Sequence, residues 1–152
     1  MAASFRVLFC WLLIFVSCKS YLSDIEKNVL YDFYYGMNGD KWTRCKWNIT
    51  MIMNQTIDHK MPRYYCGLTI IPSTESSNSL QTVHRIFFNF DNNLDPTIPK
   101  STNNLIDIVE LRIFYNPLIT GNIPQEICNL KYLYAFSITN TDLYGHLPIW
   151  HD

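Results

Sequence analysis

A repeat with a period of about 25 residues runs through the second half of the chain and restricts its fold more than any other feature. Four apolar or polar columns keep this spacing: Val83, Ile108 and Leu133; Ile86, Leu111 and Phe136; Phe88, Ile113 and Ile138; Asp91, Asn116 and Thr141. With a slip of one residue, each unit continues into Leu94, Leu118 and Leu143, and then into Ile98-Pro99, Ile123-Pro124 and Leu147-Pro148. One such unit cannot bury its own apolar side chains, so the units must stack and share one core.

Within each unit, apolar and polar residues alternate in the way that a half-buried strand requires. Leu111 and Ile113 are expected to point inward, whereas Arg112 and Phe114 point outward. The Asn116 amide is expected to bond backbone groups of the turn that leaves the strand. The repeated prolines lack an amide hydrogen and suit the irregular side of the coil, away from the sheet.

The N-terminal half predicts a helix followed by a loop and a strand. Ser23 and Glu26 form a capping box, and Ile25, Val29, Leu30 and Phe33 then lie at helical spacing. The helix should span residues 24–36 and end in the turn at 38–40, where Asn and Gly tolerate a left-handed backbone. Residues 41–65 are interpreted as a cap loop held by Trp42 and Trp47, residues 67–71 as a strand, and 72–79 as a connection.

The first twenty residues are typical of a secretory signal peptide. Arg6 is followed by ten apolar residues, 7–16, and then by a small-residue cleavage region at 17–20. A membrane anchor is the alternative, but it needs about 20 apolar residues, and no later stretch of the chain is long enough to span a bilayer. We therefore expect a signal peptide at 1–20, an N-terminal cap at 21–80 and repeats at 81–152, in a secreted protein of the extracellular space or cell wall.

Two features of the cap agree with export. Asn48-Ile49-Thr50 and Asn54-Gln55-Thr56 are glycosylation sequons. In an oxidising compartment, Cys45 and Cys66 are the natural disulfide pair, and Cys128 is left as a buried thiol. A zinc site that combines the pair with His59 and His84 is the alternative, but the spacing lacks the close ligand pairs of structural zinc sites. No metal site and no cofactor are expected.

The repeat resembles a known family. The stretch from Ile108 through Leu111, Ile113, Asn116 and Leu118 to Gly121-Asn122-Ile123-Pro124 and Leu130 is similar to the plant-type leucine-rich repeat, LxxLxLxxNxLxGxIPxxIxxL. The resemblance covers about residues 83–150, and the helix that leads into Gly39-Asp40-Lys41-Trp42-Thr43 is similar to the N-terminal cap of such proteins. It implies an α/β fold: a right-handed solenoid with a 3₁₀ or polyproline convex side, a short parallel sheet on the concave face and a helical, disulfide-linked cap.

Two positions depart from the family pattern. The cap of this family usually closes on Gly-Val-Thr-Cys, whereas this chain has Gly67-Leu68-Thr69-Ile70, so a Cys45–Cys66 pair would be a variant. The first unit also carries Pro96 where its neighbours carry Gly121 and Gly145.

The third unit is expected to expose part of the shared core. It stops shortly after Pro148, with neither a fourth unit nor a cysteine-paired C-terminal cap, and this exposes Phe136, Ile138, Leu143 and Leu147. The leading interpretation is a truncated product or a divergent remnant, and self-association through this repeat is the alternative.

The resemblance implies a recognition module that binds a protein, peptide or glycan through its concave face. The candidate contact residues are the outward strand positions Arg85, Phe87, Asn89, Glu110, Arg112, Phe114, Ala135, Ser137 and Thr139. Phe87 and Phe114 are the best candidates, because exposed aromatic residues are enriched at binding hot spots. A truncated receptor-like kinase ectodomain, an inhibitor of cell-wall hydrolases, and a purely structural extracellular role remain open alternatives.

Other classes of function find little support in the sequence. An enzyme would need a nucleophile with its base, paired acids or a metal set, and the chain has no Gly-x-Ser-x-Gly or HExxH motif and no phosphate-binding glycine loop. The four histidines, at 59, 84, 146 and 151, are scattered. The formal charge of -1 gives no general attraction to nucleic acid.

Overall fold

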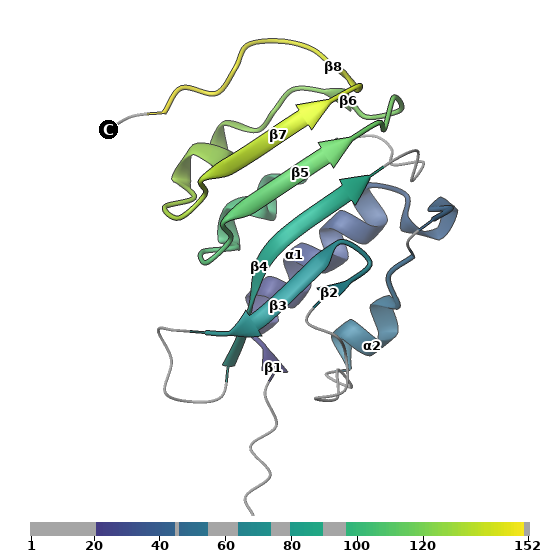
Figure 1. The fold of residues 1–152 in the computed structure, drawn as a ribbon, viewed down its shortest axis with the longest axis vertical. Helices are drawn as coiled ribbons and strands as arrows, with labels where there is room; N and C mark the ends of the chain where they lie inside the picture. The colour runs from purple at the N-terminus through teal and green to yellow at the C-terminus, as the bar shows by residue number, and fades with distance from the viewer. Residues whose placement is uncertain (1–20, 45, 55–63, 74–79, 90–96, 151–152) are drawn as a thin grey trace, which may run out of the picture.

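A six-stranded sheet forms the centre of the molecule, with helices behind it (Figure 1). The computed structural model describes residues 21–44, 46–54, 64–73, 80–89 and 97–150. The elements in chain order are β1 (Tyr21–Leu22), α1 (Asp24–Gly36), η1 (Gly39–Lys41), α2 (Ile49–Met53), β2 (Tyr64–Tyr65), β3 (Leu68–Pro72), β4 (Leu80–Asn89), η2 (Lys100–Asn104), β5 (Glu110–Phe114), β6 (Thr120–Gly121), η3 (Gln125–Asn129), β7 (Ala135–Thr139) and β8 (Asp142–Leu143).

The repeat units contribute one parallel strand each, as the period predicts. β4, β5 and β7 pair in parallel, with Arg85 opposite Glu110 and Glu110 opposite Ala135. The prediction of a parallel sheet is incomplete, however, because strands of the cap extend the sheet. β3 pairs with β4 in the antiparallel direction, and β2 pairs with β3 in the same way. The cap and the repeats therefore share one mixed sheet.

The inner side of this sheet carries the core. Leu111 and Ile113 are fully buried, whereas Arg112, which lies between them, and Phe114, which follows them, are only half-buried. This confirms the predicted alternation. The 3₁₀ helices η2 and η3 lie side by side behind the sheet (Figure 1). Each follows a proline, Pro99 or Pro124, whose backbone is extended, and this confirms that the prolines lie on the irregular side.

The turn after β5 confirms the role of Asn116 and corrects that of Leu118. The Asn116 side chain is buried, and its Nδ2 donates to the Phe114 carbonyl at 2.8 Å. Leu118 was expected in the core column, but it is 48% exposed, and Ile119 is fully buried instead. The chain has one residue more between Asn116 and Gly121 than the family pattern allows, and this extra residue turns Leu118 outward.

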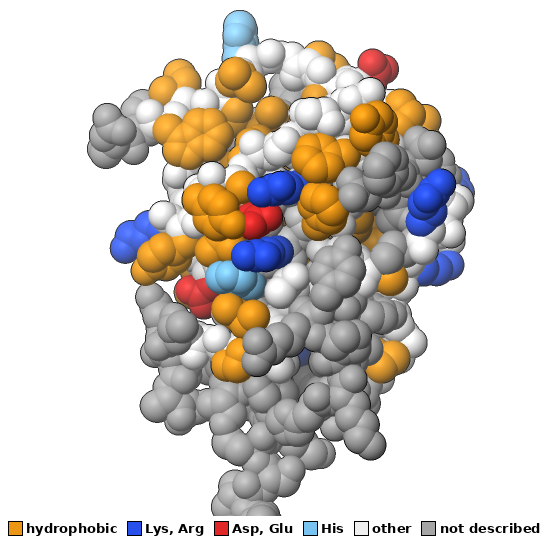
Figure 2. All heavy atoms as spheres, viewed as in Figure 1, with side chains coloured by type: hydrophobic (Ala, Val, Ile, Leu, Met, Phe, Trp, Pro, Cys, Tyr) orange, Lys and Arg blue, Asp and Glu red, His pale blue; other side chains and the backbone are white. Residues whose placement is uncertain are grey.

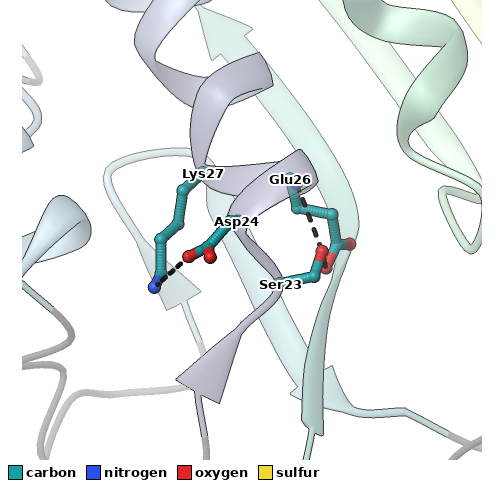
Figure 3. A network of polar contacts seen from close by, with 4 residues as sticks. All are labelled: Ser23, Asp24, Glu26 and Lys27. Atoms are coloured by element: carbon teal, nitrogen blue, oxygen red, sulfur yellow. Dashed lines mark hydrogen bonds and ion pairs between the residues drawn. The ribbon is translucent and has the colours of Figure 1, made fainter.

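Helix α1 has the predicted bounds, and it is tied to the sheet by Glu26. Ser23 caps the helix by accepting a hydrogen bond from the Glu26 amide (Figure 3). Asn38, beyond the other end of the helix, has a φ of 57°. The Glu26 carboxylate accepts hydrogen bonds from the Ser23 hydroxyl, from the Thr82 hydroxyl and from the Val83 amide of β4. Glu26 is thus buried in place of Ile25, whose predicted core position is wrong, since Ile25 is 61% exposed.

The described parts of residues 41–65 hold more regular structure than the predicted loop. They contain α2, which begins at an Asn48 cap and buries Ile52 against the core. Trp42 and Trp47 are buried as predicted: their ring nitrogens donate to the carbonyls of Met37 and Cys66. Both rings also pack on Phe88 of β4, with centroids 5.1 and 5.4 Å away, so the cap closes the end of the core at the first repeat.

The last unit is covered less than the unit before it. Phe136 and Ile138 are half-buried, whereas their register partners Leu111 and Ile113 are fully buried. Leu143 also packs partly against the core, so only Leu147, at 78% exposure, is as open as predicted. Among the described residues, no helix is long and apolar enough to cross a bilayer.

Candidate binding surface on the open face of the sheet

The face of β4, β5 and β7 that is turned away from the helices carries the predicted contact positions. We call it the open face. Because the three strands are in register, the predicted positions form rows across the sheet: Arg85, Glu110 and Ala135; Phe87, Arg112 and Ser137; Asn89, Phe114 and Thr139. Figure 2 shows an acidic side chain between two basic ones on this face, with hydrophobic side chains beside them.

Glu110 is the charged centre of the open face. Its carboxylate oxygens lie 3.4 Å from Arg85 Nε and 3.1 Å from Arg112 Nε. The Glu110 side chain is 14% exposed, whereas the side chains of Arg85 and Arg112 are 46% and 37% exposed, so both arginines remain partly accessible from solvent. Arg112 Nε is buried and makes no aligned hydrogen bond despite its short distance to Glu110. Two cations around one anion leave this face locally positive.

Tyr134 is a fourth member of this cluster that the sequence interpretation missed. Its hydroxyl donates to Glu110 Oε1, and this hydrogen bond raises the pKa of Tyr134. Tyr134 immediately precedes β7, at the position that His84 and Val109 occupy in the earlier units. Strand alternation does not assign that position to the open face, so no signal in the repeat pattern identifies Tyr134.

Phe87 and Phe114 form an aromatic pair beside the charged cluster. Their ring centroids are 5.6 Å apart and the rings are nearly perpendicular, at 89°, which is the edge-to-face arrangement that aromatic rings favour. Both side chains are half-buried, on β4 and β5 respectively. The structure therefore joins the two best candidates of the sequence analysis into one apolar element.

The remaining predicted positions differ in what they offer a partner. Ala135 and Ser137 are half-buried, and Thr139 is exposed at the end of β7. Asn89 ends β4, but its side chain lies outside the described part of the structure. The β7 positions of the open face therefore carry small side chains, next to the charged and aromatic side chains of β4 and β5.

The residues predicted for modification and disulfide formation belong to the cap, N-terminal to the strands of the open face. Asn48 and Asn54 flank α2 and are both exposed. Cys66 is half-buried, and Cys45 lies outside the described residues, so their pairing stays a prediction. Cys128 is a free, half-buried thiol whose pKa is raised by burial.

The histidines of the described chain stand apart from one another. His84 is the extra residue of a bulge in β4, where the pairing with β3 shifts, and His146 is exposed near the other end. His59 and His151 lie outside the described residues. Within the described ranges, no group of three or more His, Cys, Asp or Glu side chains is placed to hold a metal ion.

The fold is similar to those of three solved plant proteins. The leucine-rich repeat ectodomain of the receptor kinase SOBIR1 from Arabidopsis thaliana matches with a TM-score of 0.61 and 15% identity, over 84% of this chain and 60% of that one. The BIR2 ectodomain from Arabidopsis thaliana matches at 0.55 and 19%, over 84% and 60%. A plant ice-binding protein matches at 0.59 and 20%, over 85% and 36%.

These similarities concern the fold, since the identities are low, and this chain spans only about 60% of the two receptor ectodomains. No protein-family model and no curated protein sequence matches the chain. The identification made from the repeat pattern is nevertheless confirmed at the level of architecture: the chain has the leucine-rich repeat fold of plant receptor ectodomains.

Proposed function

We propose that this chain is a secreted recognition module that binds a protein or peptide through the open face, with no catalytic activity of its own. The observation that carries the proposal is the placement of the Phe87–Phe114 pair directly beside the Arg85–Glu110–Arg112 cluster, on the side of the sheet that none of the described helices covers. Aromatic and arginine side chains dominate binding energy in protein interfaces. The open face offers both together on a rigid sheet.

The two elements of the face suit different parts of recognition. The aromatic pair is already held edge to face, so a partner that covers it gains apolar contact with little loss of side-chain freedom. The charged cluster favours partners with complementary charge and sets their orientation more than their affinity. The two partly exposed arginine side chains favour an acidic partner segment.

The similar proteins support this class of function. Two of them are ectodomains of receptor proteins, which makes a receptor-type binding role the natural comparison. As part of the same proposal, residues 1–20 direct export, the solenoid is right-handed and Cys66 pairs with Cys45 to close the cap. An inhibitor of cell-wall hydrolases would use the same open face and differs only in its partner.

A photo-crosslinking experiment tests the proposal. A photoreactive amino acid replaces Ser137 on the open face in one variant and the exposed Asn104 of η2, behind the sheet, in another. In the secreted fraction of the native tissue, the probe at 137 should capture a defined partner and the probe at 104 should not. Phe114→Ala should reduce the capture at least about tenfold, as expected from a hot-spot loss of about 1.4 kcal/mol or more.

A matched surface change provides the control. Tyr144→Ala removes an aromatic ring that is 69% exposed outside the open face, and it should leave the capture unchanged. Equal capture from both probe positions, or capture that is insensitive to Phe114→Ala, would show that the open face is not the binding surface.

A further inference from the structure

An open pocket of about 590 Å³ lies in the cap, away from the open face. Its wall includes Tyr34 and Tyr35 of α1, Asp40 of η1, Lys46, and Asn48 and Thr50 at the start of α2. Asn48 and Thr50 are the first and last residues of a glycosylation sequon. A sugar attached to Asn48 would therefore be joined to the chain at the wall of the pocket.

The local structure at Asn48 is compatible with glycosylation. Asn48 is exposed and caps α2, with its Oδ1 accepting a hydrogen bond from the Met51 amide at 3.0 Å. N-glycosylation replaces a hydrogen on Nδ2 and leaves Oδ1 in place, so the helix keeps its cap. Thr50 is also exposed.

The pocket has the surface that a pyranose ring prefers. Tyr35 is 51% exposed, and its ring is held by Tyr31 and Tyr34, with centroids 4.4 and 5.1 Å away. A fixed aromatic ring that is open to water offers an apolar face on which the C–H side of a sugar can stack. The hydroxyl groups at the rim of the sugar can then meet the polar side chains that also line the pocket.

Those polar groups are held in place by their own hydrogen bonds. The Tyr34 hydroxyl donates to Asp40 Oδ1 at 2.9 Å, and Lys46 Nζ donates to the Asp40 carbonyl at 2.8 Å. A carboxylate and an ammonium group beside an aromatic face provide both acceptors and donors for a neutral, hydroxyl-rich ligand.

We propose that Asn48 carries an N-linked glycan whose first N-acetylglucosamine residue lies in this pocket against Tyr35. The co-reactant is the lipid diphosphate oligosaccharide of the secretory pathway. The Nδ2–C1 bond forms as the anomeric C–O bond to the diphosphate breaks, and the proton from Nδ2 leaves with the diphosphate. The proposal rests on the proposed export. The glycan covers the exposed Tyr35 of α1 and links α1 to α2 through the pocket.

The second sequon provides a control within the chain. Asn54 follows the last residue of α2, is exposed, and is not part of the pocket wall. Because Asn54 does not line the pocket, a glycan at Asn54 is not placed to stack on the Tyr35 ring. The two sites should therefore differ in how accessible their core sugars are.

The rate of native deglycosylation tests the proposal. The full chain is secreted from yeast, once with its own residues 1–20 and once with a yeast leader in their place, so that a failure of export is separated from a failure of glycosylation. Peptide mapping first establishes which sequons are occupied. Endoglycosidase H, which cuts between the two core N-acetylglucosamine residues, is then applied to the native and the denatured protein.

We expect Asn48 to be occupied and its glycan to be cut about tenfold more slowly in the native than in the denatured protein, as for a sugar that lies in the pocket about nine-tenths of the time. Tyr35→Ala should remove most of this protection, whereas Tyr35→Phe, which keeps the ring, and Tyr144→Ala, which removes a distant exposed ring, should not. Thermal unfolding of each variant shows that it is folded.

Four results would overturn the proposal. The first three are an unmodified Asn48 in the secreted chain, equal cutting rates at Asn48 in native and denatured protein, and protection that survives Tyr35→Ala. The fourth, where Asn54 is also occupied, is an equal native cutting rate at the two sites.

Discussion

Replacing Glu26 by alanine should strongly destabilise the fold, because this carboxylate joins the cap helix to the first repeat strand. The change removes the acceptor for the Thr82 hydroxyl and the Val83 amide, which belong to residues that are only 3% and 0% exposed. A buried polar group without a partner costs about 1–3 kcal/mol, so the two together predict a loss of roughly 2–6 kcal/mol. Since small domains have a stability of about 5–15 kcal/mol, the loss is a large fraction of the total.

Urea unfolding followed by tryptophan fluorescence measures this loss, because Trp42 and Trp47 are buried in the cap. Glu26→Gln keeps one carbonyl oxygen as an acceptor and should cost only about 1–2 kcal/mol. Asn28→Ala, at an exposed position of the same helix, should change stability by no more than about 0.5 kcal/mol. A Glu26→Ala variant within about 1 kcal/mol of the parent would refute the view that Glu26 holds the cap to the sheet.

Three further outcomes are expected. Burial, together with a hydrogen bond to Asp40, raises the pKa of Tyr34 from 10.0 to about 12. The unfolded chain therefore loses this proton first as pH rises, so the contribution of Tyr34 to stability is complete below about pH 10 and declines from there to about pH 12. The free energy of unfolding in urea should therefore fall more steeply with pH for the parent than for Tyr34→Phe across this range. Ile119→Ala should lower the free energy of unfolding by about 2–5 kcal/mol, and Leu118→Ala by less than about 1 kcal/mol. The reverse order in urea unfolding would mean that Leu118, as in the family pattern, is the core residue. Phe136→Ala should lower the stability by less than about 3 kcal/mol in the same assay, since its ring is only half-buried, and a larger loss would mean that the last unit is fully covered.

The sequence predicts the repeat strands and α1 well because both depend on local or periodic signals. The 25-residue period is also the register of the sheet, with Arg85 opposite Glu110 and Leu111 opposite Phe136. The capping box at Ser23 and the left-handed Asn38 mark the ends of α1. Stacked units repeat the same contacts, so one period describes them all.

The cap follows less closely from the sequence, since long-range contacts decide its structure. β3 was expected as a strand, but its antiparallel pairing with β4 bridges two segments with no common pattern. α2 was missed because five residues that include the β-branched Ile49 and Thr50 have low helix propensity, and its formation depends on the Asn48 cap and on the burial of Ile52.

The candidate surface shows the same division between what a period encodes and what packing decides. Two strands in register at 25 residues place Arg85 beside Glu110, and Phe114 lies two residues further along, on the diagonal from Phe87. Both contacts of the open face therefore follow from the repeat alone. Tyr134 does not, because it lies before β7, where the chain is not yet a strand, and its hydroxyl reaches Glu110 only through the packing of the last unit. The period thus determines which side chains share the open face, and the irregular turns between units determine how tightly its charges are held.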